Sequence, residues 1–266
     1  MAEGPAEQLN QTVNTQPVML TAGYAAYRAW TSLGGAAPAM VAGHSLGEYT
    51  ALVAAGVLAF RDALPLVRFR AQAMQEAVPQ GQGAMAAVLG LEENEVRVAC
   101  AEAAQGEVVQ AVNFNSPGQV VIAGHAAAVT RACDAAKARG AKRALPLPVS
   151  APFHSALMQP AAERLRDYLQ GVAFSAPRIP VINNVDVACY EDPARIKDAL
   201  VRQAFNPVRW VETIQAFAAQ GVTHVAECGP GKVLAGMSKR IAGSLESMAL
   251  TDKASIELGA ALGKGA

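Results

Sequence analysis

The chain has 266 residues, of which 52% are apolar and 17% are charged. This is enough for one large hydrophobic core, or for a core domain with a smaller second one. The 22 basic and 22 acidic side chains cancel, so no net field attracts nucleic acid or an anionic membrane. The first residues lack the basic and apolar segments of a signal peptide. We therefore expect a cytoplasmic protein that binds neither nucleic acid nor membrane.

The first third of the chain alternates helical and strand-like patterns. Apolar spacing predicts helices over residues 16–33, 46–56 and 61–78, and a β-rich run predicts a strand over residues 36–42. Pro79 ends the third helix. A strand followed at once by a helix is typical of an α/β protein with a mainly parallel sheet.

The middle of the chain changes character. The patterns predict, in order, a strand, a helix, two strands, a helix and a strand, over residues 83–90, 92–105, 108–115, 119–125, 126–139 and 141–149. This βαββαβ order is typical of a ferredoxin-like domain. We expect residues 79–150 to form a small domain inserted into a larger one made of residues 1–78 and 151–266.

The last part returns to the alternation of the first. It predicts, in order, a helix, an extended stretch, two helices, a strand and a final helix, over residues 155–171, 178–187, 192–204, 208–220, 222–227 and from about Lys232 onward. An Ala/Gly-rich tail follows Ala254.

The segment Gly43-His44-Ser45-Leu46-Gly47 fits the G-x-S-x-G pattern of a nucleophile elbow. It lies between the predicted strand and a helix, which is the context that the pattern requires. Glycines at both ends would allow strand and helix to approach closely around a strained turn. The segment nominates Ser45 as a nucleophile. An ordinary strand-to-helix turn, with Ser45 as a helix N-cap, is the alternative.

A base for this serine is available in Pro152-Phe153-His154, where the chain returns from the small domain to the large one. Clefts form at such junctions, and a serine hydroxyl needs a base within hydrogen-bonding distance. We therefore predict that His154 faces Ser45, although a structural histidine would fit the same pattern. The four cysteines, Cys100, Cys133, Cys189 and Cys228, form no C-x-x-C motif. They indicate reduced thiols and no metal site.

Several segments together resemble the malonyl-CoA:acyl carrier protein transacylases of bacterial fatty-acid synthesis. They are collinear across nearly the whole chain: residues 43–49, 67–75, 113–119, 152–154, 202–208 and 227–232. The resemblance implies an α/β-hydrolase-like large domain with a ferredoxin-like insertion. It also implies malonyl-CoA and acyl carrier protein as substrate and partner, a monomer, and no metal or other cofactor.

The resemblance also implies roles for particular residues. Ser45 would carry the malonyl group and His154 would be the base, oriented by the backbone carbonyl of Gln203. Arg70 would bind the free carboxylate of malonyl, which a guanidinium can clamp with two parallel hydrogen bonds. The backbone N–H of Leu46 would stabilise the oxyanion. Three further residues would line the substrate site: Met74, Asn115 and Phe153.

One family feature does not occur in this sequence. Members open with a strand and a Gly-Gln-Gly-Ser-Gln loop that supplies a second oxyanion donor, whereas Gly81-Gln82-Gly83 follows a helix stop and lacks the Ser-Gln continuation. We therefore expect this chain to lack that donor and one core strand, with Met1 either a mis-assigned start or a true truncation. Two other functions stay open: a serine thioesterase, and a weakly catalytic protein that binds malonyl-CoA or carrier protein.

Overall fold

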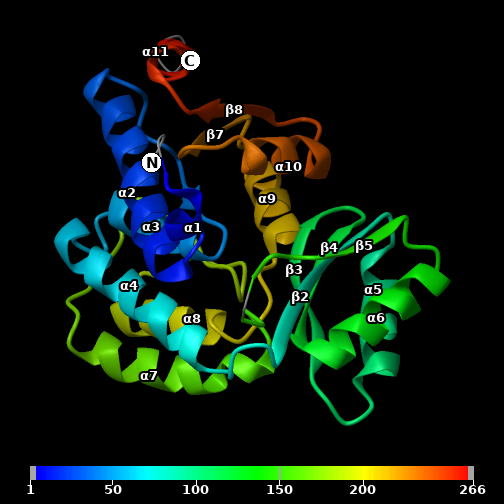
Figure 1. Cartoon of the computed structure of the whole chain (residues 1–266). Coiled ribbons are helices and arrows are strands. Elements are labelled where there is room, and N and C mark those ends of the chain that lie inside the picture. Colours follow the sequence, from blue (N-terminus) through cyan, green and yellow to red (C-terminus); the bar gives the residue numbers. More distant parts are fainter. Residues whose placement is uncertain (1–3, 150, 263–266) are drawn as a thin grey trace.

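The computed structural model describes residues 4–149 and 151–262, which fold into helices packed around short parallel strand pairs and one antiparallel sheet (Figure 1). The first segment contains α1 (Ala6–Leu9), α2 (Thr12–Ser32), β1 (Val41–Ala42), α3 (Leu46–Ala54) and α4 (Phe60–Glu76). Strand β1 pairs in parallel with β6 (Val181–Ile182). Helices α2, α3 and α4 pack on one another and bury a large core.

The middle segment forms a four-stranded antiparallel sheet with the strand order β3-β4-β2-β5. Its elements are β2 (Gly83–Leu89), α5 (Glu93–Ala104), β3 (Val109–Ser116), β4 (Gln119–His125), α6 (Ala126–Ala138) and β5 (Arg143–Pro146). Helices α5 and α6 pack together beside this sheet, at the right of Figure 1. The connectivity and strand order are those of a ferredoxin-like fold. The domain boundaries at residues 78/79 and 150/151 stay a prediction.

The last segment completes the larger part of the molecule. It contains the short 3₁₀ turn Ala156–Met158, α7 (Gln159–Gln170), β6, α8 (Pro193–Gln203), α9 (Trp210–Ala219), β7 (His224–Cys228), α10 (Val233–Ile241), β8 (Glu246–Leu250) and α11 (Lys253–Leu262). Strands β7 and β8 are parallel. The fold is therefore the expected mixed α/β class, with parallel strand pairs beside one antiparallel sheet.

A backbone bridge at Val208 joins the small sheet to the larger part of the molecule. Val208, just before α9, bridges β3 in parallel at Asn113, and its backbone N–H and C=O bond Val112 and Phe114. This contact fixes β3 beside the start of α9 and near the end of α8. The cleft between the two parts of the molecule therefore has a defined wall on each side.

Helix α4 shows why a charged side chain is buried in this fold. Its buried residues recur mostly at three- and four-residue spacing, at positions 63, 66, 67, 70, 71, 73 and 74. This spacing is typical of the apolar face of an amphipathic helix. Arg70 lies on that face, whereas Arg68 lies off it and is exposed. The periodicity of α4 therefore directs the Arg70 side chain inward.

Some expected elements differ in extent, and α1, β8 and α11 were not expected. The strands expected over residues 36–42 and 141–149 are shorter, because ladder pairing occurs only where β6 and β2 lie alongside. Strand β8 was missed, since its pairing partner β7 decides its conformation. The expected Ala/Gly-rich tail is largely helix α11, which packs on α2 and β8. Within the described ranges, no helix is long and apolar enough to cross a membrane.

Candidate active site

Ser45 lies in a strained turn between β1 and α3. Its backbone has φ 52° and ψ −106°, a conformation that costs energy for a residue with a side chain. Although Ser45 is the N-cap residue of α3, its side chain makes no capping hydrogen bond. The hydroxyl is directed to other side chains instead, which favours the elbow over the plain N-cap alternative.

The two glycines of the elbow differ in their surroundings. A Cβ on Gly43 would lie 1.9 Å from the carbonyl carbon of Gly47 and 2.5 Å from the Glu48 nitrogen, whereas a Cβ on Gly47 would meet nothing within 4 Å. Gly43 is therefore required by a close backbone approach. The expectation that Gly47 serves the same purpose is wrong, because its Cβ position is open.

His154 faces Ser45 across the cleft, as the sequence predicts. Its Nε2 lies 2.8 Å from Ser45 Oγ, and its Nδ1 lies 2.8 Å from the backbone oxygen of Gln203. Since a carbonyl can only accept a hydrogen bond, Nδ1 carries the proton and Nε2 is free to accept one from the serine. Burial and the nearby cation of Arg70 lower the pKa of His154 to about 3. The imidazole is therefore neutral at physiological pH.

Arg70 is 2% exposed and reaches the nucleophile from α4. Its Nη2 donates to Ser45 Oγ at 3.1 Å and to Gln203 Oε1 at 2.9 Å, and its Nη1 donates to Gln16 Oε1 at 2.8 Å. The Arg70 guanidinium lies over the ring of Tyr49, and its Cζ is 5.3 Å from the ring centroid. These hydrogen bonds go to uncharged oxygen atoms. Burial lowers the pKa of Arg70, because it disfavours the charged guanidinium. An anion beside the guanidinium would therefore be strongly favoured.

Sequence reasoning missed three polar residues at this site: Gln16, Glu48 and Asn184. Glu48 is buried, and its Oε2 accepts from the Asn184 backbone N–H at 2.9 Å and from Gln203 Nε2 at 2.8 Å. Burial raises the pKa of Glu48 to about 7. A signal for Glu48 was present, because it is the one charged residue of the apolar helix α3. Asn184 follows β6 at a strand's carboxyl end, where sites are commonly built.

Leu46 and the predicted lining residues also lie near the cleft. Leu46 is the first residue of α3, so its backbone N–H has no partner within the helix. Asn115 lies on β3, and its Oδ1 is 2.8 Å from His44 Nε2. Met74 is buried in a cluster that Phe153 packs against, and Phe153 also contacts the small sheet. Phe153 therefore lies between the two parts of the molecule.

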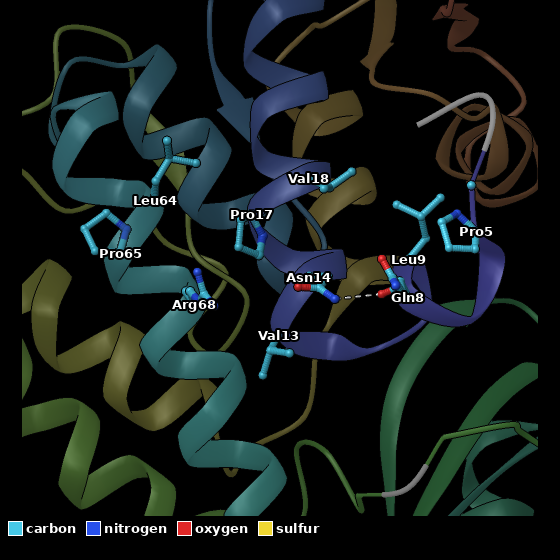
Figure 2. Close-up of a pocket in the computed structure, with 11 residues that line it drawn as sticks. Pro5, Gln8, Leu9, Val13, Asn14, Pro17, Val18, Leu64, Pro65 and Arg68 are labelled. Carbon is cyan, nitrogen blue, oxygen red and sulfur yellow. Dashed lines mark hydrogen bonds between the residues drawn. The ribbon is translucent and has the colours of Figure 1, made fainter.

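Two of the surface pockets differ in their relation to this site. One, of about 270 Å³, is lined by His154 together with residues of α5, β3 and the segment after α8. The other, of about 570 Å³, lies between α1, α2 and α4 and includes Arg68 at its edge (Figure 2). The lining of this larger pocket contains none of the candidate site residues. Among the residues that the structure describes, no group of three or more metal-ligating side chains is placed to hold an ion.

A serine on an elbow, a neutral histidine in contact with it and a ferredoxin-like βαββαβ segment beside them are typical of enzymes that carry acyl groups on serine. Residues 1–254 match the family described as the acyl transferase domain. The Escherichia coli strain K12 malonyl CoA-acyl carrier protein transacylase is 60% identical over 250 residues, covering 94% of this chain and 81% of the relative. The Bacillus subtilis strain 168 enzyme is 47% identical over 257 residues, covering 96% and 81%.

Solved structures agree. The acyl-carrier-protein S-malonyltransferase of Burkholderia pseudomallei 1710b is 66% identical, with a TM-score of 0.96, covering 98% of this chain and 85% of that one. A malonyl-transacylase in complex with its type II PKS acyl-carrier protein is 53% identical, with a TM-score of 0.96, covering 98% and 84%. The chain belongs to the acyl transferase family and, within it, to the malonyl CoA-acyl carrier protein transacylases.

The elbow geometry predicts opposite outcomes for two alanine substitutions. Gly43→Ala should destabilise the fold by about 3 kcal/mol or more, because the new methyl group meets backbone atoms that cannot move aside. Gly47→Ala is the matched control, and it should be neutral or stabilise α3 by up to about 1 kcal/mol. Urea unfolding of both variants measures this difference. Equal losses in the two variants would contradict the close approach at Gly43.

The environment of His154 predicts an imidazole that resists protonation. Because burial and Arg70 disfavour the charged form, the pKa lies near 3, and His154 should stay neutral at pH 5. The sequence has four histidines, so the ring signals can be separated by NMR and assigned with a His154→Gln variant. A His154 signal that titrates near the ordinary value of 6.5 would show that the ring is solvated.

Proposed function

We propose that this chain transfers the malonyl group of malonyl-CoA to the phosphopantetheine thiol of acyl carrier protein, through a malonyl ester of Ser45, and so supplies fatty-acid synthesis. The observation that carries the proposal is the contact of Ser45 Oγ with two groups at once: His154 Nε2 at 2.8 Å and Arg70 Nη2 at 3.1 Å. The first is a base, and the second is a buried cation beside the nucleophile. Relatives whose names state this activity support it.

In the first half-reaction, Ser45 Oγ attacks the thioester carbonyl as its proton passes to His154 Nε2. The tetrahedral intermediate places its negative charge near the backbone N–H of Leu46. When it collapses, the C–S bond breaks and the leaving CoA sulfur takes the proton from His154. The low pKa of His154 makes the imidazolium a strong acid, which favours this return of the proton.

In the second half-reaction, the carrier-protein thiol gives its proton to His154 and attacks the Ser45 ester. The ester C–O bond breaks, and Ser45 regains its proton from His154. The Gln203 carbonyl holds the ring in the same tautomer throughout. Each half-reaction balances with proton transfers alone, so we propose that the reaction needs no metal or redox cofactor.

Arg70 supports selectivity for malonyl over uncharged acyl groups. A malonyl carboxylate differs from an acetyl methyl group by a negative charge that a guanidinium binds with two parallel hydrogen bonds. Arg70 is already desolvated and hydrogen-bonded to uncharged oxygen atoms, so the carboxylate would replace weak acceptors with an ion pair. Phe153 and Met74 would form the apolar wall beside it and crowd a branched acyl group. Asn115, held by His44, would line the side nearest the small sheet.

We further infer a cytoplasmic location. Cys100, Cys133, Cys189 and Cys228 are all free thiols, which is typical of proteins from a reducing compartment.

Ser45 should become malonylated when the protein is mixed with malonyl-CoA. The ester should be detectable by intact-mass measurement, removable with hydroxylamine and transferable to holo-carrier protein. Ser45→Ala should give no adduct, whereas Ser155→Ala is the control that alters the neighbour of His154 without touching the nucleophile. The same adduct on the Ser45→Ala protein would overturn the assignment. Release of free malonate without acceptor would indicate a hydrolase, and binding without transfer a carrier of malonyl-CoA.

Arg70→Ala should lower malonyl transfer by about 100-fold or more, because two charge-assisted hydrogen bonds are lost. Acetyl transfer should change far less, since acetyl has no carboxylate. Arg68→Ala, an exposed position on the same helix, is the matched control and should affect neither. Rates with malonyl-CoA and acetyl-CoA measure the comparison. A parallel loss with both substrates would mean that Arg70 supports the fold or Ser45 alone.

A further inference from the structure

The strained turn at Ser45 is bonded on both sides by the side chain of Asn184, which follows a neighbouring strand. Asn184 is fully buried and follows β6, which pairs with β1 before the elbow. Its Oδ1 accepts from the Ser45 backbone N–H at 2.7 Å, and its Nδ2 donates to the Gly43 carbonyl at 2.8 Å. The amide therefore spans the turn and bonds it on both sides of His44. Strained backbone persists where its surroundings hold it, and these two bonds do so here.

A second buried side chain, Glu48, is bonded to the backbone of Asn184. One oxygen of Glu48 accepts from the Asn184 backbone N–H and from Gln203 Nε2. Gln203 Nε2 is also 3.0 Å from the Ser45 carbonyl oxygen, and the Gln203 backbone oxygen receives His154 Nδ1. Glu48 thus connects the residue that holds the nucleophile with the residue that orients the base.

We infer that Asn184 and Glu48 are positioning residues, which hold Ser45 Oγ within reach of His154 and do not touch the substrate. Neither side chain is hydrogen-bonded to Ser45 Oγ or to the imidazole, so both act through backbone and through Gln203. Their loss should slow reactions of Ser45 without weakening the binding of malonyl-CoA. The malonylation assay rests on the proposed function. The test therefore also includes a reaction of Ser45 that needs no malonyl-CoA.

The principal variant is Asn184→Ala, and Asn183→Ala is its matched control. Asn183 is also buried and its side chain also makes two hydrogen bonds, to the Ala188 carbonyl and from the Asp186 backbone N–H. Neither bond goes to the elbow. We measure the single-turnover rate of Ser45 malonylation at saturating malonyl-CoA, and the concentration that half-saturates it. Asn184→Ala should lower the rate at least about tenfold with the half-saturating concentration within about twofold of the wild type. Asn183→Ala should change neither.

The second readout is the rate at which phenylmethylsulfonyl fluoride sulfonylates Ser45, followed by intact mass. It should fall in Asn184→Ala in proportion to the malonylation rate. If the wild type reacts with the sulfonyl fluoride but not with malonyl-CoA, the proposed function fails while the positioning role is still measured. If Asn184→Ala reacts as fast as the wild type in both assays, the positioning role is overturned.

Glu48 is tested with Glu48→Ala and Glu48→Gln. Because one oxygen accepts both hydrogen bonds, the glutamine amide can keep them, and Glu48→Gln should retain the sulfonylation rate within about threefold while Glu48→Ala loses about tenfold or more. Equal losses would overturn the role assigned to Glu48. Should Asn184→Ala not fold, Asn184→Asp keeps the side-chain volume and the acceptor but not the donor to Gly43, and it should show the same slow reaction. If neither folds while Asn183→Ala does, Asn184 is structural and the inference fails.

Discussion

The site depends on burying one cation, Arg70, beside an uncharged nucleophile. A desolvated guanidinium is costly unless polar groups surround it, and Gln16, Gln203 and Ser45 supply oxygen atoms to it. The same cation helps to keep His154 neutral and partly offsets the burial of Glu48. The charge of Arg70 therefore acts in three ways: it helps to lower the pKa of His154, it binds Ser45 Oγ, and it would attract a carboxylate.

The backbone around Ser45 shows how the fold supports this chemistry. A positive φ occurs at both Ser45 and His154, so the two residues that face each other are both held in conformations that side chains rarely adopt. Their hydrogen bonds come from three directions: β6 through Asn184, α8 through Gln203 and α4 through Arg70. These bonds from neighbouring elements hold the two turns in strained conformations, in which Ser45 Oγ lies 2.8 Å from His154 Nε2.

Much of this arrangement follows from local sequence. The βαββαβ pattern predicts the small sheet, because alternating and helical periodicities are properties of each segment alone. The elbow pattern predicts Ser45, and a proline-rich junction predicts His154. The short strand β8 was missed because its conformation depends on pairing with β7. Gln16 was missed because a glutamine on an apolar helix face is visible only once its partner, Arg70, is known to face it.

The sequence by itself predicted most of the helices and strands in their order and the turn that presents Ser45, while the role of Arg70 came from the family resemblance. The tertiary structure alone decided which distant polar groups meet there. Glu48 and the Asn184 backbone are 136 residues apart, and the side chains of Arg70 and Gln203 are 133 apart. Such contacts depend on how strand ends and helix ends pack, and local periodicity does not encode that packing.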